Sequence, residues 1–287
     1  MSSDEIELPA LLAASSQFIL LIAGVIALWR CVLSPRGRAA MRQPSPLGRW
    51  AIPLPDFGLA ILVVIAGGVG GQIAASLLFK SLNIESDLSM VAIGFGFQGG
   101  LLAGAAIAAI TVLKPNLQPL DEHEPVRPVP PPPSSTSIWI SGPVSLLAGL
   151  PVLVAVNLGW TSLLEFLQWD TSQQPLVNLF ADSDSSLTLF GMAFLAVVVA
   201  PITEEVIFRA GLYRYLRERT PRWVALGAPA LIFGSMHGNL VAFVPLLIIG
   251  LVFALAYERT GRIGVPIIAH ALFNLNTVLL LQSGVQV

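Results

Sequence analysis

The amino-acid sequence alternates long apolar stretches with short polar segments, and the apolar stretches have the length of membrane-spanning helices. Three of them, Leu8–Trp29, Phe57–Phe79 and Leu88–Leu113, contain no charged residue. A helix that crosses a bilayer needs about 20 apolar residues. Five further stretches are similarly apolar, some of them shorter: Ile138–Trp160, Leu187–Ile202, Trp223–Met236, Leu240–Tyr257 and Ile263–Leu281. The pattern predicts an all-α protein, a polytopic membrane helical bundle with about eight transmembrane helices.

The composition agrees with a membrane protein. Of the 287 residues, 55% are hydrophobic and 11% are charged, and the mean hydropathy is +0.78, whereas a soluble domain carries about 25% charged residues. The chain has no P-loop, no dinucleotide-binding glycine pattern and no basic stripe typical of nucleic-acid binding. We therefore expect the lipid bilayer as the surrounding medium and no nucleic acid as a partner.

Positive charges alternate between the two ends of the apolar stretches. Arginine and lysine follow the first, third, fifth and seventh stretches, whereas the other connecting segments are mainly acidic. Cytoplasmic loops are enriched in Lys and Arg. We therefore expect the basic segments inside, both termini outside, and an integral protein of a bacterial-type plasma (inner) membrane.

A proline-rich segment divides the chain. Residues Gln118–Ser137 include seven prolines, so this segment cannot continue a helix. We predict an N-terminal three-helix membrane region over 1–113, a proline-rich cytoplasmic linker over 114–137 and a C-terminal core over 138–287.

Polar side chains interrupt the apolar stretches of the C-terminal core: Glu204, Glu205 and Arg209, then His237, then His270 and Asn274. An ionisable group inside a bilayer costs a few kcal/mol, so such groups indicate function. If the fifth helix continues to Arg217, a rise of 1.5 Å per residue puts Glu204, His237 and His270 about 16–22 Å from the arginine-marked helix ends. Three separate helices would then hold polar groups at similar depth.

Spacing along the chain groups these side chains further. Glu205 and Arg209 are four residues apart and can form an ion pair on one helix face. Phe233 shares a face with His237 by the same spacing, as His270 does with Asn274.

Pro201 is a second local signal, because it lies three residues before Glu204. Proline has no backbone N–H, so in a helix it leaves the carbonyl of Val197 without its usual donor. We expect a kink just before the two carboxylates.

A carboxylate and a histidine can activate water, either as a general base pair or around a metal. A second histidine with an asparagine supplies donors for a developing oxyanion. No serine or cysteine has a base close by in the pattern, so hydrolysis by activated water is the favoured hypothesis. Three alternatives remain: structural polar residues that tie helices together, a transporter with a Glu/His proton relay, and a non-catalytic scaffold or immunity factor.

The motifs resemble those of the CAAX prenyl protease and bacteriocin-processing family of intramembrane endopeptidases, also called the abortive-infection family. Residues 204–209, EEVIFR, resemble its EExxxR motif. FGSMH at 233–237 and HALFN at 270–274 resemble its FxxxH and HxxxN motifs, in the family's order. The resemblance covers roughly residues 187–281 and not the N-terminal helices or the linker.

The resemblance implies a membrane protease whose site opens toward the cytosol and whose substrates are peptides or prenylated CAAX-type proteins. It implies that Glu204 and His237 activate water, that His270 and Asn274 stabilise the oxyanion, and that Glu205, Arg209 and Phe233 support them. Members are commonly labelled metalloproteases. A zinc ion held by Glu204, His237 and His270 is therefore a candidate cofactor, although the spacing is not HExxH and a glutamate-activated water needs no zinc.

Overall fold

The computed structural model describes residues 8–84, 87–114, 137–169 and 185–283. All regular secondary structure in these ranges is helical, which confirms the predicted class of a polytopic helical membrane protein. Most of the predicted linker over 114–137 lies outside the described residues, and the division of the chain there stays a prediction.

Seven helical segments in the described ranges are long and apolar enough to cross a membrane: Leu8–Leu33, Leu54–Ser81, Asp87–Leu113, Ile138–Phe166, Ser186–Arg217, Leu240–Thr260 and Gly264–Gln282. The remaining predicted span, the sixth in chain order at Trp223–Met236, corresponds to α10, Arg222–Met236. Its 15 residues rise about 22 Å, less than the hydrocarbon thickness of about 30 Å. The next helix, α11 (Leu240–Thr260), therefore begins inside the hydrocarbon layer that the other spans cross.

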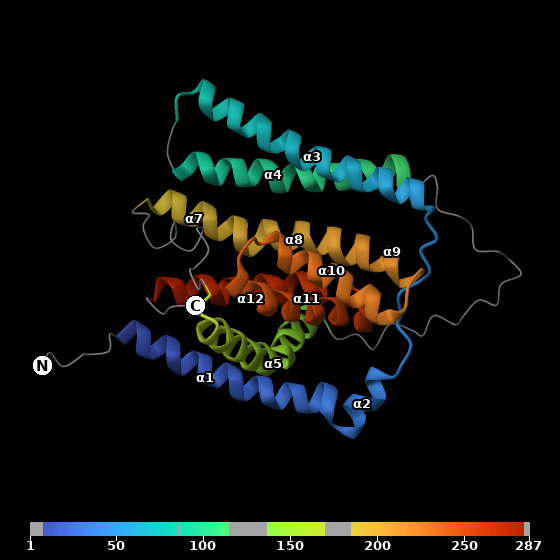
Figure 1. Ribbon diagram of the computed structural model, residues 1–287, viewed down its shortest axis with the longest axis vertical. Coiled ribbons are helices and arrows are strands. Elements are labelled where there is room, and N and C mark those ends of the chain that lie inside the picture. The colour runs from blue at the N-terminus through green and yellow to red at the C-terminus, as the bar shows by residue number, and fades with distance from the viewer. Residues whose placement is uncertain (1–7, 85–86, 115–136, 170–184, 284–287) are drawn as a thin grey trace, which may run out of the picture.

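Two groups of N-terminal helices flank the central helices (Figure 1). On one side, α3 (Leu54–Ser81) and α4 (Asp87–Ala108) pack closely, since a Cβ added at Gly71 would lie 2.1 Å from the carbonyl oxygen of Gly96. α4 also contacts α7 (Ser186–Phe194) and α8 (Ala200–Glu205). On the other side, α1 (Leu8–Leu28) packs against α5 (Ile138–Phe166).

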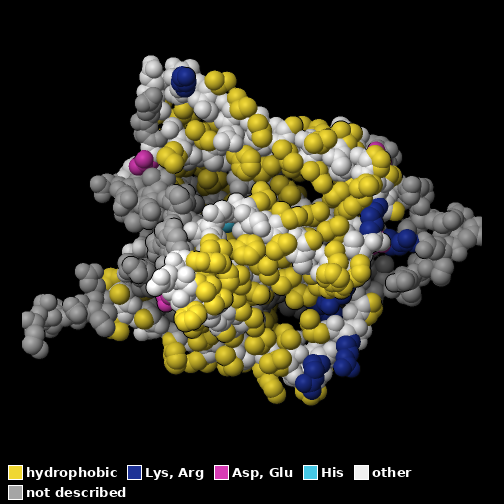
Figure 2. Space-filling model, in the orientation of Figure 1, with side chains coloured by type: hydrophobic (Ala, Val, Ile, Leu, Met, Phe, Trp, Pro, Cys, Tyr) yellow, Lys and Arg dark blue, Asp and Glu magenta, His cyan; other side chains and the backbone are white. Residues whose placement is uncertain are grey.

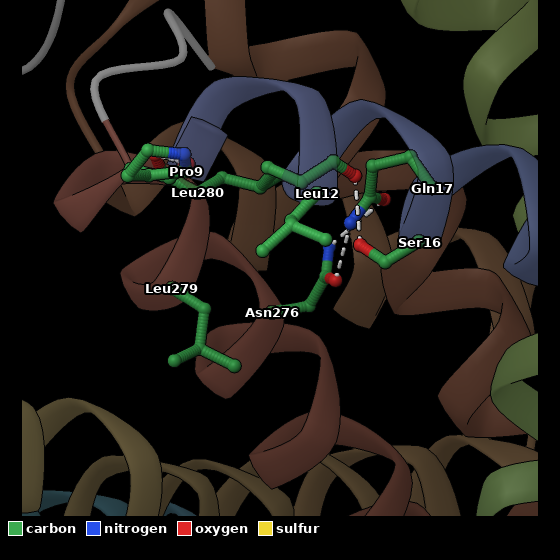
Figure 3. A pocket seen from close by; sticks show the side chains of 9 residues that line it. Pro9, Leu12, Ser16, Gln17, Asn276, Leu279 and Leu280 are labelled. Carbon is green, nitrogen blue, oxygen red and sulfur yellow. Dashed lines mark hydrogen bonds between the residues drawn. The ribbon is translucent and has the colours of Figure 1, made fainter. Parts of the chain in front are cut away.

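An amide pair joins α1 to α12 (Gly264–Gln282). Gln17 Nε2 donates to Asn276 Oδ1 at 2.8 Å, and Asn276 Nδ2 donates to Gln17 Oε1 at 3.3 Å. Figure 3 shows the pair beside a pocket of about 320 Å³ between the two helices. Because each amide donates to and accepts from the other, the pair attaches α1 to the core through hydrogen bonds between helices.

The fifth membrane segment is one continuous helix from Ser186 to Arg217, with two π-helical parts. These parts are η3 (Leu195–Val199), which precedes α8, and η4 (Val206–Tyr213), which follows it. The helix ends with α9 (Arg214–Arg217). At the end of η3, the N–H of Ala200 donates to the carbonyl of Leu195, five residues back. The helix thus reaches Arg217, as the depth argument requires, and π turns of this kind often mark functional sites.

A non-helical segment, residues 43–53, follows the short α2 (Pro35–Met41) and crosses the ends of the central helices (Figure 1). Its carbonyl groups accept hydrogen bonds from arginines of the core: Arg259 donates to Gln43 at 2.9 Å, Arg217 to Leu47 at 3.1 Å, and Arg219 to Ile52. Leu47 and Ile52 are buried, Leu47 against Tyr213 and Tyr257, and Ile52 against Tyr215. The segment therefore ties the N-terminal helices to the core.

The surface fits a chain surrounded by lipid. Hydrophobic side chains cover most of the face in Figure 2, and many of them are large and exposed, such as Phe18, Leu62 and Phe190. Lys and Arg side chains gather in that view mainly at the end where α2 and α9 lie. An integral membrane protein with several spans explains both features.

We expect the 43–53 segment to contribute to stability through its arginine contacts. Changing Arg217 and Arg219 together to Ala removes charged donors from two carbonyls, at a cost of about 1 kcal/mol or more each. The melting temperature in detergent should fall by several degrees. The control variant Arg36→Ala/Arg38→Ala removes the same charge from exposed positions of α2 and should melt near wild type; equal melting of both variants would contradict the assignment.

Candidate active site

The candidate site lies where α8, η4, α12 and the end of α10 meet. Glu204 and Glu205 end α8, Arg209 follows on η4, and His270 is on α12. Glu205, Arg209 and His270 are buried, whereas the side chain of Glu204 remains 20% exposed. The accessible carboxylate is thus the one that can meet a substrate or water.

Arg209 is the cation of the site. Its Nη1 donates to Glu205 Oε1 at 2.9 Å, and its Nη2 donates to the carbonyl of Gly250 at 3.0 Å. The guanidinium carbon lies 5.0–5.8 Å from the ring centroids of three phenylalanines, Phe208, Phe233 and Phe253. A guanidinium out of water needs such partners, because its desolvation is otherwise uncompensated. The predicted pairing of Glu205 with Arg209 is therefore present, inside an aromatic cage.

His270 lies between the two carboxylates. Its Nδ1 is 2.9 Å from Glu205 Oε1, and its Nε2 is 3.7 Å from Glu204 Oε2. Because an ionised carboxylate only accepts, His270 Nδ1–H is the donor to Glu205. With both carboxylates ionised and His270 neutral, the four side chains Glu204, Glu205, Arg209 and His270 carry a net charge of −1. One additional proton, either on Glu204 or on His270 Nε2, makes the cluster neutral. A low-dielectric surrounding favours that neutral state.

His237 caps the C-terminus of α10, at the turn into α11 (Leu240–Thr260). Its Nδ1 is 2.8 Å from the carbonyl oxygen of Phe233, which can only accept, so Nδ1 carries the hydrogen and the neutral ring has its lone pair on Nε2. The Phe233 ring contacts both histidines edge-on, at 5.0 Å from His237 and 5.7 Å from His270. The two histidines thus lie beside the same phenylalanine ring.

Asn274 lies one helical turn beyond His270 on α12 but makes a different contact. Its Nδ2 donates at 2.7 Å to the carbonyl of Ala196, in η3. The structure thus links the other sequence-predicted residues in one chain of contacts that runs from Glu204 through His270 to His237, and it joins Asn274 to the backbone of the same long helix.

Two residues of α11 complete the site without having been predicted. Gly250 provides the carbonyl that Arg209 binds, and the ring of Phe253 stacks on His270 at 4.8 Å with an interplanar angle of 25°. Both are apolar residues within an apolar span. Their spacing of three residues places them on one helix face, which is the only sequence signal that could have found them.

The candidate zinc ligands are not arranged around a common metal position. Among the described residues, no group of three or more His, Cys, Asp or Glu side chains is placed to hold a metal ion. Glu204, His237 and His270 therefore do not form a ligand set as they lie, and the Nδ1 atoms of both histidines are bonded within the protein. We derive no step through a metal.

The fold and the site define a polytopic membrane protein with a buried acid–histidine cluster. Residues 186–276 match the sequence model of the family described as "Type II CAAX prenyl endopeptidase Rce1-like", and the chain therefore carries a domain of this family. The resemblance seen in the motifs is confirmed.

Two curated proteins are similar to the same part of the chain. "Putative membrane peptidase YdiL" of Bacillus subtilis (strain 168) is 37% identical over 89 residues, which is 31% of this chain and 36% of that protein. "UPF0177 protein YbdI" of Lactococcus lactis subsp. lactis (strain IL1403) is 32% identical over 93 residues, 32% of this chain and 50% of that protein. The matches thus span half the length of these relatives or less. No solved structure matches the chain.

We expect that removing only one charge of the Glu205–Arg209 ion pair destabilises the fold more than removing both. Arg209→Ala leaves the Glu205 carboxylate buried without its cation, which costs about 3–5 kcal/mol. The variant Glu205→Gln/Arg209→Met removes both charges and should regain much of that stability. Thermal unfolding in detergent measures both. A single variant as stable as wild type, or a double variant less stable than the single one, would contradict this role.

Proposed function

We propose that this protein is an intramembrane endopeptidase that hydrolyses a peptide bond with a water molecule activated by Glu204 and His237. The observation that carries the proposal is the 3.7 Å separation of Glu204 Oε2 and His270 Nε2 in a site shielded by helices. This distance is too long for a direct hydrogen bond, but a water beside the two atoms can bond to both at about 2.8 Å.

The proton arrangement supports general base catalysis. With the cluster's single proton on His270, Glu204 is ionised and takes a proton from water, while the lone pair on His237 Nε2 accepts the second hydrogen and orients the water. The water oxygen then bonds to the scissile carbonyl carbon. The protonated Nε2 of His270 donates to the resulting oxyanion.

The second half of the reaction uses the same groups. Glu204, now protonated, gives its proton to the leaving amine as the carbon–nitrogen bond breaks, which returns the carboxylate. Glu205 and Arg209 stay paired and hold His270 through Nδ1. One water proton thus ends on the leaving amine and the other stays on the new carboxyl group. The four groups regain their starting protonation, and together with the substrate they carry no net charge at any step.

For the substrate, the family supports a peptide carried by a membrane-associated protein, with prenylated CAAX-type proteins as the first class to test. The arginine-rich end supports a cytosolic location for the 43–53 segment in a bacterial plasma membrane. Glu204 is thirteen residues from Arg217, about 20 Å along the helix. We therefore place the site within the bilayer, open toward the cytosol.

Glu204→Gln and His237→Ala should each lower hydrolysis by about 10²- to 10⁴-fold, because each removes a group that handles protons. Both variants should keep the wild-type melting temperature within a few degrees. Turnover of a fluorogenic prenylated peptide in proteoliposomes measures the effect. Glu165→Gln, an exposed carboxylate near the end of α5, is the control and should remain active.

The same preparation separates the alternatives. Near-wild-type turnover by either variant would rule out the assigned roles, and Glu204-dependent proton flux without hydrolysis would favour a transporter. A chelator should leave turnover unchanged. Loss of turnover that zinc restores would replace the water mechanism with a metal-dependent one.

A further inference from the structure

Pro201 removes a hydrogen-bond donor at a position different from the one the sequence predicts. In an α-helix, the missing N–H would leave the carbonyl of Val197 unpaired. The N–H of Ala200, however, is given to Leu195, five residues back, so the helix enters Pro201 in the π register. In that register residue 201 would donate to the carbonyl of Ala196, five residues back, but proline has no N–H to donate.

The carbonyl of Ala196 therefore receives no hydrogen bond from the backbone N–H of residue 200 or of residue 201. Ala200, its donor in an α turn, is engaged with Leu195, and Pro201, its donor in a π turn, has no hydrogen. The hydrogen bond from Asn274 Nδ2, at 2.7 Å, fills this gap. An unpaired carbonyl in the hydrocarbon region is costly, and a neighbouring helix is the usual source of a replacement donor.

We propose that Asn274 is a positioning residue for Glu204, acting through the carbonyl of Ala196. Asn274 and His270 are on α12, while Ala196 and Glu204 are on one continuous helix, eight residues apart. The bond from Asn274 holds that helix against α12, about one turn along α12 and about two turns along the long helix from the contact between His270 and Glu204. It therefore sets the separation across which the two groups share a proton. This role rests on the proposed hydrolysis, but the bond itself does not.

The test compares Asn274→Ala in two backgrounds, wild type and Pro201→Ala. An alanine at 201 restores a backbone N–H, so the helix can pair the freed carbonyl by itself. We expect Asn274→Ala to lower kcat about tenfold in the wild-type background, the equivalent of one lost buried hydrogen bond, with KM little changed. In the Pro201→Ala background the same change should cost about threefold or less.

Two further readouts separate positioning from a merely structural role. Asn274→Ala should shift the pH profile of kcat, because Glu204 and His270 no longer keep their separation, and Pro201→Ala should restore the profile. A purely structural loss would lower the amount of active protein without moving the profile. Asn274→Leu keeps about the same size but has no hydrogen-bond donor, so it should behave like Asn274→Ala; wild-type behaviour would overturn the proposal even if Pro201→Ala did not fold.

Melting temperatures test the bond without any activity. Asn274→Ala should lower the melting temperature by several degrees in the wild-type background and by clearly less with Pro201→Ala. An equal loss of kcat and of melting temperature in both backgrounds would overturn the proposal and return Asn274 to direct contact with the substrate. If no preparation hydrolyses peptide, the proposed function fails while the melting temperatures still decide whether Asn274 replaces the missing donor.

Discussion

The architecture of the site depends on one shared oxygen, Glu205 Oε1, which lies 2.9 Å from both Arg209 Nη1 and His270 Nδ1. Arg209 makes it possible to keep this carboxylate out of water, because a buried charge needs a cation and hydrogen bonds. The carboxylate in turn fixes the orientation of His270, so that Nε2 faces Glu204. Adjacent residues on one helix thus divide two tasks: Glu205 is enclosed and holds the cluster, while Glu204 is accessible and can exchange protons.

Adjacent carboxylates reach different surroundings because successive residues of an α-helix point about 100° apart, and the long helix is irregular on both sides of them. Two π-helical parts enclose α8, and a π turn changes the angular position of the residues beyond it. The first of these turns leaves the carbonyl of Ala196 without a regular partner, and Asn274 of a neighbouring helix satisfies it. A neighbouring helix likewise supplies the carbonyl of Gly250 to the guanidinium of Arg209. The site is therefore stabilised by contacts among helices far apart in the chain and not by any one helix.

The N-terminal helices contribute attachments more than chemistry. α1 is joined to α12 by the amide pair of Gln17 and Asn276, and the 43–53 segment is held by arginines of α9 and α11 and by Arg219 just beyond α9. Sequence reasoning interpreted these arginines only as markers of one membrane side, and it could not foresee that they would donate hydrogen bonds to backbone carbonyls of a distant segment. Such contacts have no spacing signature, because any residue can provide a carbonyl.

From the sequence alone, hydropathy determined the class of fold, and the spacing of four residues determined the pair of Glu205 with Arg209, because both follow from helical periodicity and the cost of charge in lipid. The motifs likewise indicated the family. Only the tertiary structure decided that His270 lies between the two carboxylates, that Phe253 stacks on it, and that Asn274 binds Ala196. These contacts depend on the rotation and depth of one helix relative to another, and on a π turn whose register no local sequence pattern specifies.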